Sequence, residues 1–185
     1  MFKDYNLDQV NKIQVVKQAD VVMLLYLLEH KFSKEVKKSN YDYYEKRTLH
    51  DSSLSLSTHS ILASDIDEKD LAYKLFQEAT KIDLGENMKT SDHGIHAASL
   101  GGLWQIVVNG FGGVRMVGGN LIINPKLPEN WSRLSFSFMW KGNKLDIELT
   151  KEGIKIEVKD EMLEEIEILV YDTKYVLNQI LKIKF

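Results

Sequence analysis

The spacing of hydrophobic residues changes near the middle of the chain, and this change predicts an α+β fold. Up to residue 113, apolar residues recur at intervals of three and four, which is typical of helices. Beyond it they alternate with polar residues, as in strands that bury one face. Glycines at 110, 112 and 113 lie at the change, where glycine can end a helix. We therefore expect a helical segment over residues 1–113 and a β-sheet domain over residues 114–185.

The helical half contains segments with different patterns. Residues 21–28 are apolar on all sides, so we expect this helix to be buried all round inside a larger helical assembly. Residues 67–79 form an amphipathic pattern, which Asp67 is expected to cap. Residues 91–113 begin with a polar, glycine-containing turn and continue with apolar residues at helical spacing. This last segment lies where the helical pattern gives way to the strand pattern, and the chain is organised around it.

The second half predicts a small antiparallel sheet, packed as a sandwich. Gly118 and Gly119 separate two short apolar runs and indicate a hairpin. The clearest alternation of apolar and polar residues occurs over residues 134–140, 145–149 and 154–158, with weaker strands expected around 166–171, 175–177 and 180–183.

Composition and charge exclude several classes of protein. The chain has 185 residues, of which 44% are hydrophobic and 28% charged, as in an ordinary globular domain. A net charge of −3 argues against a surface for nucleic acid or anionic membranes. The absence of cysteine excludes disulfide and thiolate chemistry and agrees with a cytoplasmic protein. We expect no membrane span, because the longest apolar run is far shorter than the roughly 20 residues needed, and no signal peptide, because the start lacks an apolar core.

The turn at residues 92–96, Asp-His-Gly-Ile-His, is the first candidate site. A helix N-terminus presents unpaired backbone N–H groups and the positive end of the helix dipole, which favour an anion. Gly94 would allow the backbone to approach a ligand closely, and His96 would add a side-chain donor. The alternative is a turn that merely starts a helix.

A second junction lies at Ser52 and Ser53. Together with Asp51 they are typical of a helix N-cap, although two adjacent hydroxyls can also bind an oxyanion. The serines lack the flanking glycines of a nucleophile elbow, so we reject a serine hydrolase. Lys17 stands with Gln18 at the start of the apolar helix, where a positive charge opposes the helix dipole. This placement indicates a negative or polyhydroxylic ligand, or else a lysine that extends to solvent.

Several ordered motifs carry a resemblance to a known family. They are Lys17-Gln-Ala-Asp-Val21, Thr48-x-His-Asp-Ser-Ser-Leu-Ser55, Gly94-Ile-His-Ala-Ala-Ser-x-Gly-Gly-x-Trp104, Gly110-Phe-Gly-Gly-Val-Arg115 and Pro125-x-Leu-Pro-x-x-Trp131. Together they resemble the C-terminal part of the inverting α-glucoside phosphorylases of glycoside hydrolase family 65, which act on maltose, trehalose or kojibiose. The resemblance implies the final helices of an (α/α)6 barrel followed by a small C-terminal β-sheet domain.

The resemblance also implies a reaction and its ligands. In the family, inorganic phosphate is the co-substrate and attacks the anomeric carbon of an α-linked glucose disaccharide, giving β-glucose 1-phosphate. No metal and no other cofactor is implied. The family positions that contact the substrates match Lys17 and Gln18 for the glucosyl group, and Ser52, Ser53, Gly94 and His96 for phosphate.

The family's general acid is a glutamate upstream of the position of Lys17, and no residue here matches it. The resemblance therefore implies no catalytic residue in this chain, and we expect no phosphorolysis by the chain alone. The expected partner is an upstream chain that carries the rest of the barrel, or a second copy in a homodimer. Two alternatives are a non-catalytic helical and β-sheet module or relic, and a fragment of a hydrolase of the same fold.

Overall fold

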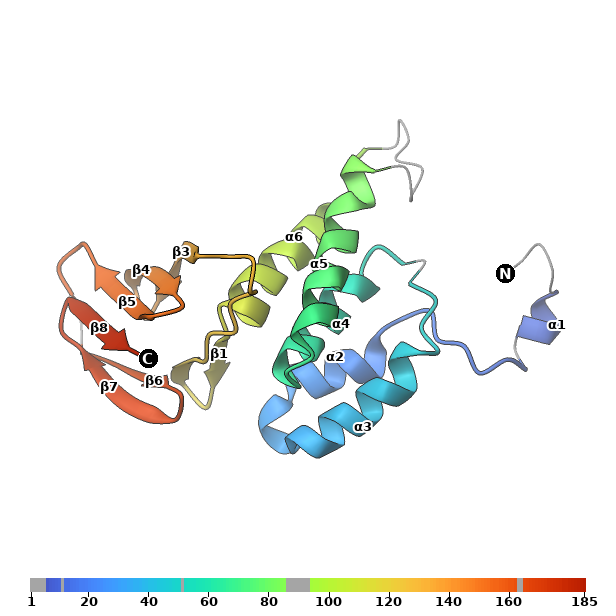
Figure 1. Ribbon diagram of the computed structural model, residues 1–185, viewed down its shortest axis with the longest axis horizontal. Coiled ribbons are helices and arrows are strands. Elements are labelled where there is room, and N and C mark those ends of the chain that lie inside the picture. Colours follow the sequence, from blue (N-terminus) through green and yellow to red (C-terminus); the bar gives the residue numbers. More distant parts are fainter. Residues whose placement is uncertain (1–5, 11, 51, 86–93, 163–164) are drawn as a thin grey trace.

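The computed structural model describes residues 6–10, 12–50, 52–85, 94–162 and 165–185. Figure 1 shows the helices gathered on the right and the strands on the left, with α6 leading from one group to the other. The helices are α1 (Leu7–Val10), α2 (Asp20–Leu27), α3 (Lys34–Glu45), α4 (Ser55–Asp65), α5 (Lys69–Leu84) and α6 (Ala97–Gln105), with a 3₁₀ turn at Glu29–Lys31 and a π-helical turn at Ile106–Phe111 that continues α6.

Helix α4 lies at the centre of the helical half, in contact with α2, α3, α5 and α6. Residues 57–64 of this helix are all buried, although most of them are polar. Short hydroxyl side chains tolerate this burial because they find backbone acceptors on neighbouring elements. Ser60 Oγ donates to the carbonyl oxygen of Ala72 at 2.8 Å, and Ser64 Oγ donates to that of Gly110 at 3.1 Å.

The helix predicted to be buried all round is buried on one side only. Helix α2 buries Val22, Leu25 and Tyr26. The apolar side chains on its other side, Met23, Leu24, Leu27 and Leu28, are between 36% and 62% exposed. The described helices cover one side of α2 and leave the other open, so the burial expected inside a larger helical assembly is not complete within this chain.

Helices α2, α4 and α6 run in the same direction. Ser57 near the start of α4 lies against Gly102 of α6, where a Cβ atom would come within 2.7 Å of Ser57 Oγ. Ser64 near the end of α4 reaches Gly110 beyond the end of α6. Tyr26 in the last turn of α2 accepts a hydrogen bond from Asn109 Nδ2 at 2.8 Å. These contacts place the N-termini of the helices at one end of the molecule.

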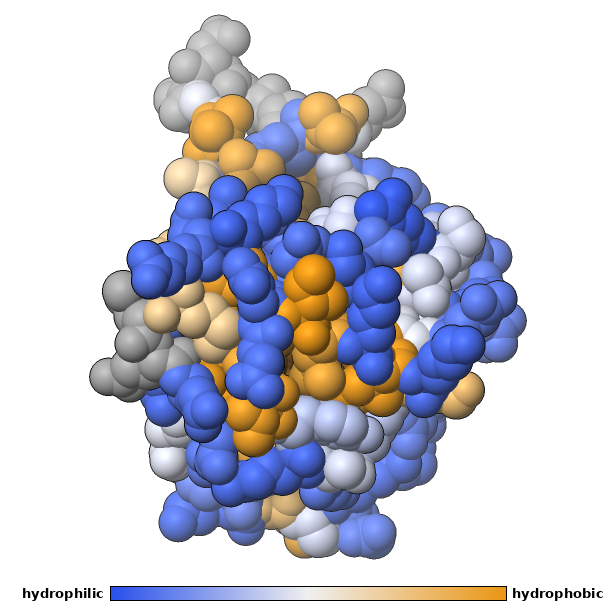
Figure 2. Space-filling view, turned by 90° about the vertical axis from the view of Figure 1, so that its left-hand side faces the viewer, coloured by the Kyte–Doolittle hydropathy of each residue, from blue (hydrophilic) through white to orange (hydrophobic). Residues whose placement is uncertain are grey.

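The strands form two four-stranded sheets, ordered β1-β2-β6-β7 and β3-β4-β5-β8. Buried residues of both sheets belong to one continuous hydrophobic core, so the sheets pack together as the alternation predicted. The strands are β1 (Val114–Val117), β2 (Asn120–Ile123), β3 (Arg133–Trp140), β4 (Asn143–Thr150), β5 (Gly153–Val158), β6 (Ile166–Val170), β7 (Thr173–Leu177) and β8 (Ile180–Lys184). Figure 2 views this end of the molecule, where the surface is mainly hydrophilic, with apolar residues showing between the hydrophilic ones.

One strand pairing departs from the predicted antiparallel arrangement. Strands β2 and β6 pair in parallel, with Leu121 opposite Ile168. Between them the chain builds β3, β4 and β5 of the other sheet and then returns. A long connection of this kind allows parallel pairing, which a short hairpin cannot.

An aromatic cluster joins the helices to the segment that leads into the second sheet. Trp131 lies with its ring centroid 5.3 Å from that of Phe111 and 5.7 Å from that of Phe76, both edge to face. Tyr73 completes the cluster at 6.4 Å from Trp131. Such pairs add to the free energy of burial, so the crossing segment is held firmly against α5 and the end of α6.

Gly113, between the helices and the strands, is expected to be intolerant of any side chain. Its φ is +66°, and a Cβ atom would lie 1.8 Å from the carbonyl oxygen of Asn124. Gly113→Ala should lower the free energy of unfolding by about 3 kcal/mol or more, measured by urea denaturation. Gly118→Ala is the matched control, because φ is +57° there but no atom lies within 4 Å of the added Cβ. It should cost only about 1 kcal/mol, and equal losses would contradict the steric argument.

Candidate functional site

Lys17 and Gln18 lie beside the segment that leads to Ser52. A short parallel bridge pairs Val16 with Thr48. The Val16 N–H donates to the Arg47 carbonyl at 2.8 Å, and the Leu49 N–H donates to the Val16 carbonyl at 3.1 Å. Lys17 and Gln18 are both exposed and precede the first residue of α2, Asp20. The bridge therefore brings the predicted glucosyl-contacting residues close in space to the chain approaching α4.

Ser52 and Ser53 are half-buried and stand just ahead of α4, which begins at Ser55. Ser52 Oγ accepts from the Leu54 N–H at 3.4 Å, and the Ser52 carbonyl accepts from the Ser55 N–H at 3.3 Å. Leu54 occupies the N-cap position, and no side chain caps the helix there. The N-cap prediction for these serines was therefore wrong, and Asp51, the third residue of that motif, lies outside the described residues.

Gly94 and His96 stand at the start of α6. Gly94 is exposed, with φ at +101°, a conformation that suits glycine. His96 immediately precedes the first residue of α6, Ala97, and its ring contacts a carboxylate: Nδ1 lies 2.7 Å from Oδ1 of Asp83. Asp92 and His93, the first two residues of the predicted turn, lie outside the described residues.

These residues lie at the same end of the helical half, but the cavity beside Ser52 is not lined by all of them. Ser52 lines a cavity of about 490 Å³, together with Glu45, Leu49, His50, Leu56, Leu71, Lys74, Leu75, Glu78 and Ile82. His96 and Gly94 do not line it. The last turn of α5 lies between the two places, because Ile82 lines the cavity and the next residue, Asp83, binds His96.

Two histidines that the sequence motifs did not indicate as site residues lie at this end of α4. His50 precedes the helix, and His59 belongs to it. His59 is fully buried, and neither of its ring nitrogens has a hydrogen-bond partner among the described residues. Its ring centroid lies 4.7 Å from that of His50 and 5.6 Å from that of Tyr41. Burial, with a smaller contribution from the charge of His50, lowers the pKa of His59 to about 3. His59 is therefore a neutral core residue near pH 7.

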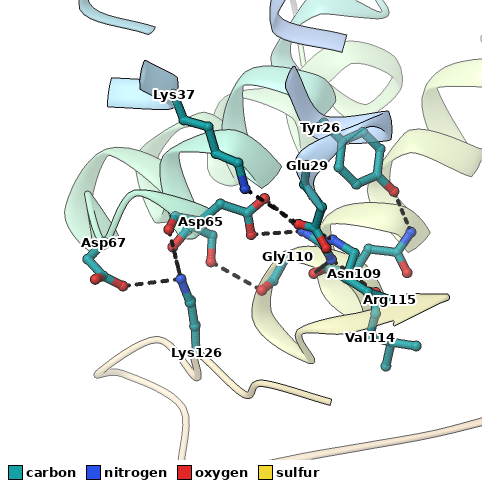
Figure 3. A network of polar contacts seen from close by, with 11 residues as sticks. Tyr26, Glu29, Lys37, Asp65, Asp67, Asn109, Gly110, Val114, Arg115 and Lys126 are labelled. Carbon is teal, nitrogen blue, oxygen red and sulfur yellow. Dashed lines mark hydrogen bonds and ion pairs between the residues drawn. The ribbon is translucent and has the colours of Figure 1, made fainter. Parts of the chain in front are cut away.

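A second polar cluster lies at the opposite end of the helices (Figure 3). The guanidinium of Arg115 on β1 binds both carboxylate oxygens of Asp65, at 2.8 and 2.9 Å, and Oε2 of Glu29 at 3.0 Å. Burial acts to lower the pKa of Arg115, but the two carboxylates outweigh it and raise that pKa. Lys126 donates to the carbonyl oxygens of Ser64 and Asp65. These charges satisfy one another, so the cluster acts as a joint between helices and strands.

Asp67 belongs to this joint and does not cap α5 as predicted. Helix α5 begins at Lys69, and Glu68 occupies its N-cap position. The carboxylate of Asp67 instead pairs with Lys126 at 3.2 Å and with Lys34. The hydrogen bond from Lys34, and a weaker one from Lys126, hold the pKa of Asp67 below its usual value.

Neither a metal site nor a membrane helix is found in the part of the chain that the structure describes. No group of three or more histidine, aspartate or glutamate side chains there could hold a metal ion. No described helix is both long and apolar enough to cross a bilayer.

Comparison with known proteins identifies the family. Residues 1–105 match the family model for the glycosyl hydrolase family 65 central catalytic domain, and residues 114–177 match the model for its C-terminal domain. The chain belongs to glycosyl hydrolase family 65. This confirms the resemblance carried by the ordered motifs, including the one that contains Arg115.

Several relatives within family 65 are phosphorylases by name, and they are much longer than this chain. A kojibiose phosphorylase of Halothermothrix orenii is 46% identical over 181 residues, which cover 96% of this chain and 23% of that protein. An α,α-trehalose phosphorylase of Thermoanaerobacter brockii is 44% identical over 170 residues, which cover 92% of this chain and 22% of that protein. A solved structure, a putative kojibiose phosphorylase from the human microbiome, matches with a TM-score of 0.90 and 35% identity. The match covers 98% of this chain and 24% of that one. The chain thus spans about a quarter of the length of these relatives.

Proposed function

We propose that this chain supplies the phosphate-binding part, and a portion of the glucosyl site, of a family 65 disaccharide phosphorylase. The reaction is the transfer of a glucosyl group from an α-linked disaccharide to inorganic phosphate, which gives β-glucose 1-phosphate and a free sugar. The observation that carries the proposal is the parallel course of α4 and α6, because the N-termini of both helices lie at one end of the molecule. Ser52 and Ser53 precede one helix and His96 the other.

This arrangement suits an attacking phosphate. Two helix N-termini present backbone N–H groups and positive dipole ends, and hydroxyl and imidazole groups add side-chain donors. Inverting sugar transfer requires the attacking group and the general acid on opposite faces of the sugar. In the proposal, Ser52, Ser53, Gly94 and His96 hold phosphate on one face, and Lys17 and Gln18 contact the glucosyl group. The general acid comes from outside this chain, and phosphate is needed only as co-substrate, with no cofactor.

The exposed apolar sides of α2 and α6 support a role within a larger barrel. Leu24 and Leu27 of α2 are 46% and 62% exposed, and Leu100 and Trp104 of α6 are 44% and 52% exposed. Both helices flank α4, so these apolar sides lie where further parallel helices would continue the series. We infer that residues 1–113 are the final part of an (α/α)6 barrel and residues 114–185 its C-terminal β-sheet domain. The rest of the barrel would come from an upstream polypeptide, in the cytoplasm.

A chimera tests the proposed function. This chain would replace the matching C-terminal residues of the Halothermothrix orenii kojibiose phosphorylase, and glucose 1-phosphate would be assayed with kojibiose and phosphate. The chimera is expected to be active. Ser52→Ala with Ser53→Ala should raise the KM for phosphate about tenfold or more, because hydrogen bonds to a charged group are lost.

Ser39→Ala, on the exposed side of α3, is the control and should leave the KM for phosphate unchanged. A folded chimera that releases glucose without consuming phosphate would favour the hydrolase alternative. A folded chimera with neither activity would favour a non-catalytic module, and either result would overturn the proposal.

A further inference from the structure

A single carboxylate holds both the ring and the main chain of His96. Asp83 lies in the last turn of α5, and its side chain is only 11% exposed. Its Oδ1 lies 2.7 Å from Nδ1 of His96, and both of its oxygens accept from the His96 backbone N–H, at 3.1 and 3.3 Å. The two residues are 13 positions apart in the sequence, so the contact joins the end of α5 to the start of α6.

This contact determines which ring nitrogen can meet a ligand. A carboxylate only accepts hydrogen bonds when ionised, so Nδ1 must carry the hydrogen that points to Asp83. In the neutral ring, Nε2 then has the lone pair, and in the protonated ring it carries a second hydrogen. The imidazole is 35% exposed, and its Nε2 is not used by the contact with Asp83.

We propose that Asp83 is a positioning residue, which binds Nδ1 of His96 and so directs Nε2 toward the phosphate site. The proposal rests on the proposed function, because that function assigns phosphate to His96. The protonated imidazole would stand between two anions, donating from Nδ1 to Asp83 and from Nε2 to a phosphate oxygen. Carboxylates that bind the second nitrogen of a ligand-binding histidine orient the ring in this way in metal sites.

The expected sign of the effect separates positioning from simple electrostatics. Asp83 carries a negative charge near the proposed anion, so charge alone predicts that its removal would strengthen phosphate binding. Positioning predicts the opposite, because the ring would lose the fixed orientation in which the protonated imidazole donates from Nε2. Asp83→Ala is therefore expected to weaken binding of inorganic phosphate to this chain by about tenfold.

Nitrogen NMR of the ring of His96, at a pH where the imidazole is neutral, reports the tautomer. A phosphate titration at a lower pH, where the imidazole is protonated, reports the affinity. The wild-type chain should show hydrogen on Nδ1, and Asp83→Ala should shift the population toward hydrogen on Nε2. Asp70→Ala, in the first turn of the same helix, removes a carboxylate that is 13 positions away and should change neither the tautomer nor the affinity.

The outcomes distinguish the inference from the proposed function. An unchanged tautomer in Asp83→Ala, or unchanged or tighter phosphate binding, would overturn the positioning role even if the wild-type chain binds phosphate. A tautomer shift in Asp83→Ala, combined with no saturable phosphate binding by the wild-type chain, would support the orienting contact and count against the phosphate site itself.

Discussion

Arg115→Ala is expected to lower the free energy of unfolding by about 3–5 kcal/mol, because it leaves the carboxylate of Asp65 without its counter-charge and Glu29 with only Lys37 among the described residues. The side chains of Arg115, Asp65 and Glu29 are only 10%, 12% and 18% exposed. Arg115 also donates to the carbonyl oxygens of Val114 and Asn109, which would lose a partner. Because these contacts join β1 to the ends of α2 and α4, the loss should appear in a single urea unfolding transition followed by circular dichroism.

Arg133→Ala provides the matched control for this prediction. Arg133 pairs with Glu148 on the surface of the second sheet, where the two side chains are 60% and 39% exposed. Water and salt screen such a pair, so its removal should change the free energy of unfolding by less than about 0.5 kcal/mol. A loss at Arg115 no larger than that at Arg133 would show that the buried cluster does not hold the two halves together.

Acid is expected to destabilise the chain through His59 well before most carboxylates titrate. The pKa of His59 is about 3 in the folded state, against about 6.5 for an unperturbed histidine. Below about pH 6.5 the unfolded chain therefore binds a proton that the folded chain does not, and stability falls until the pH reaches about 3. The full difference corresponds to about 4–5 kcal/mol, of which about 2–3 kcal/mol should be lost by about pH 4.5.

His59→Leu should remove most of this dependence, since leucine has no proton to gain. The measurement is the free energy of unfolding in urea at several values between pH 7 and pH 4.5, for the wild-type chain and the variant. Burial also lowers the pKa of His50, so a smaller slope in the same direction should remain. His30→Ala serves as the control because His30 is exposed, and it should retain the wild-type slope. Parallel curves for wild type and His59→Leu would refute the assignment.

The local pattern of apolar and polar residues was sufficient to predict the order and type of most helices and strands. The change from helix to strand spacing put the boundary at residue 113, and in the structure the last helical turn ends at Phe111 and the first strand begins at Val114. The Gly118–Gly119 turn joins β1 to β2 as expected, with Val117 opposite Asn120. These features depend on backbone preferences and on alternation within a few residues, which a sequence displays directly. The ordered motifs likewise led to the family.

The candidate site was predicted only in part. Lys17, Gln18, Ser52, Ser53, Gly94 and His96 were selected by motif, and their roles remain predictions. Asp83 was missed because nothing in its local sequence distinguishes it from other acidic residues near a helix end. Its importance comes from a contact across 13 positions, which only the packing of α5 against the start of α6 creates. Arg115 was quoted within a motif, but its partners lie 50 and 86 positions away.

The sequence by itself determined the class of fold, the succession of helices and strands and the family, because each of these depends on the spacing of apolar residues or on short motifs. Tertiary structure decided which helix is central. Composition favoured the apolar residues 21–28, yet the serine-rich α4 is enclosed, because its short hydroxyls can bond to backbone carbonyls of Ala72 and Gly110. The parallel pairing of β2 with β6, the ion pairs of Arg115 and the hydrogen bond between His96 and Asp83 also arise from tertiary packing. Each depends on which surfaces meet after the chain has folded, and no local pattern specifies that.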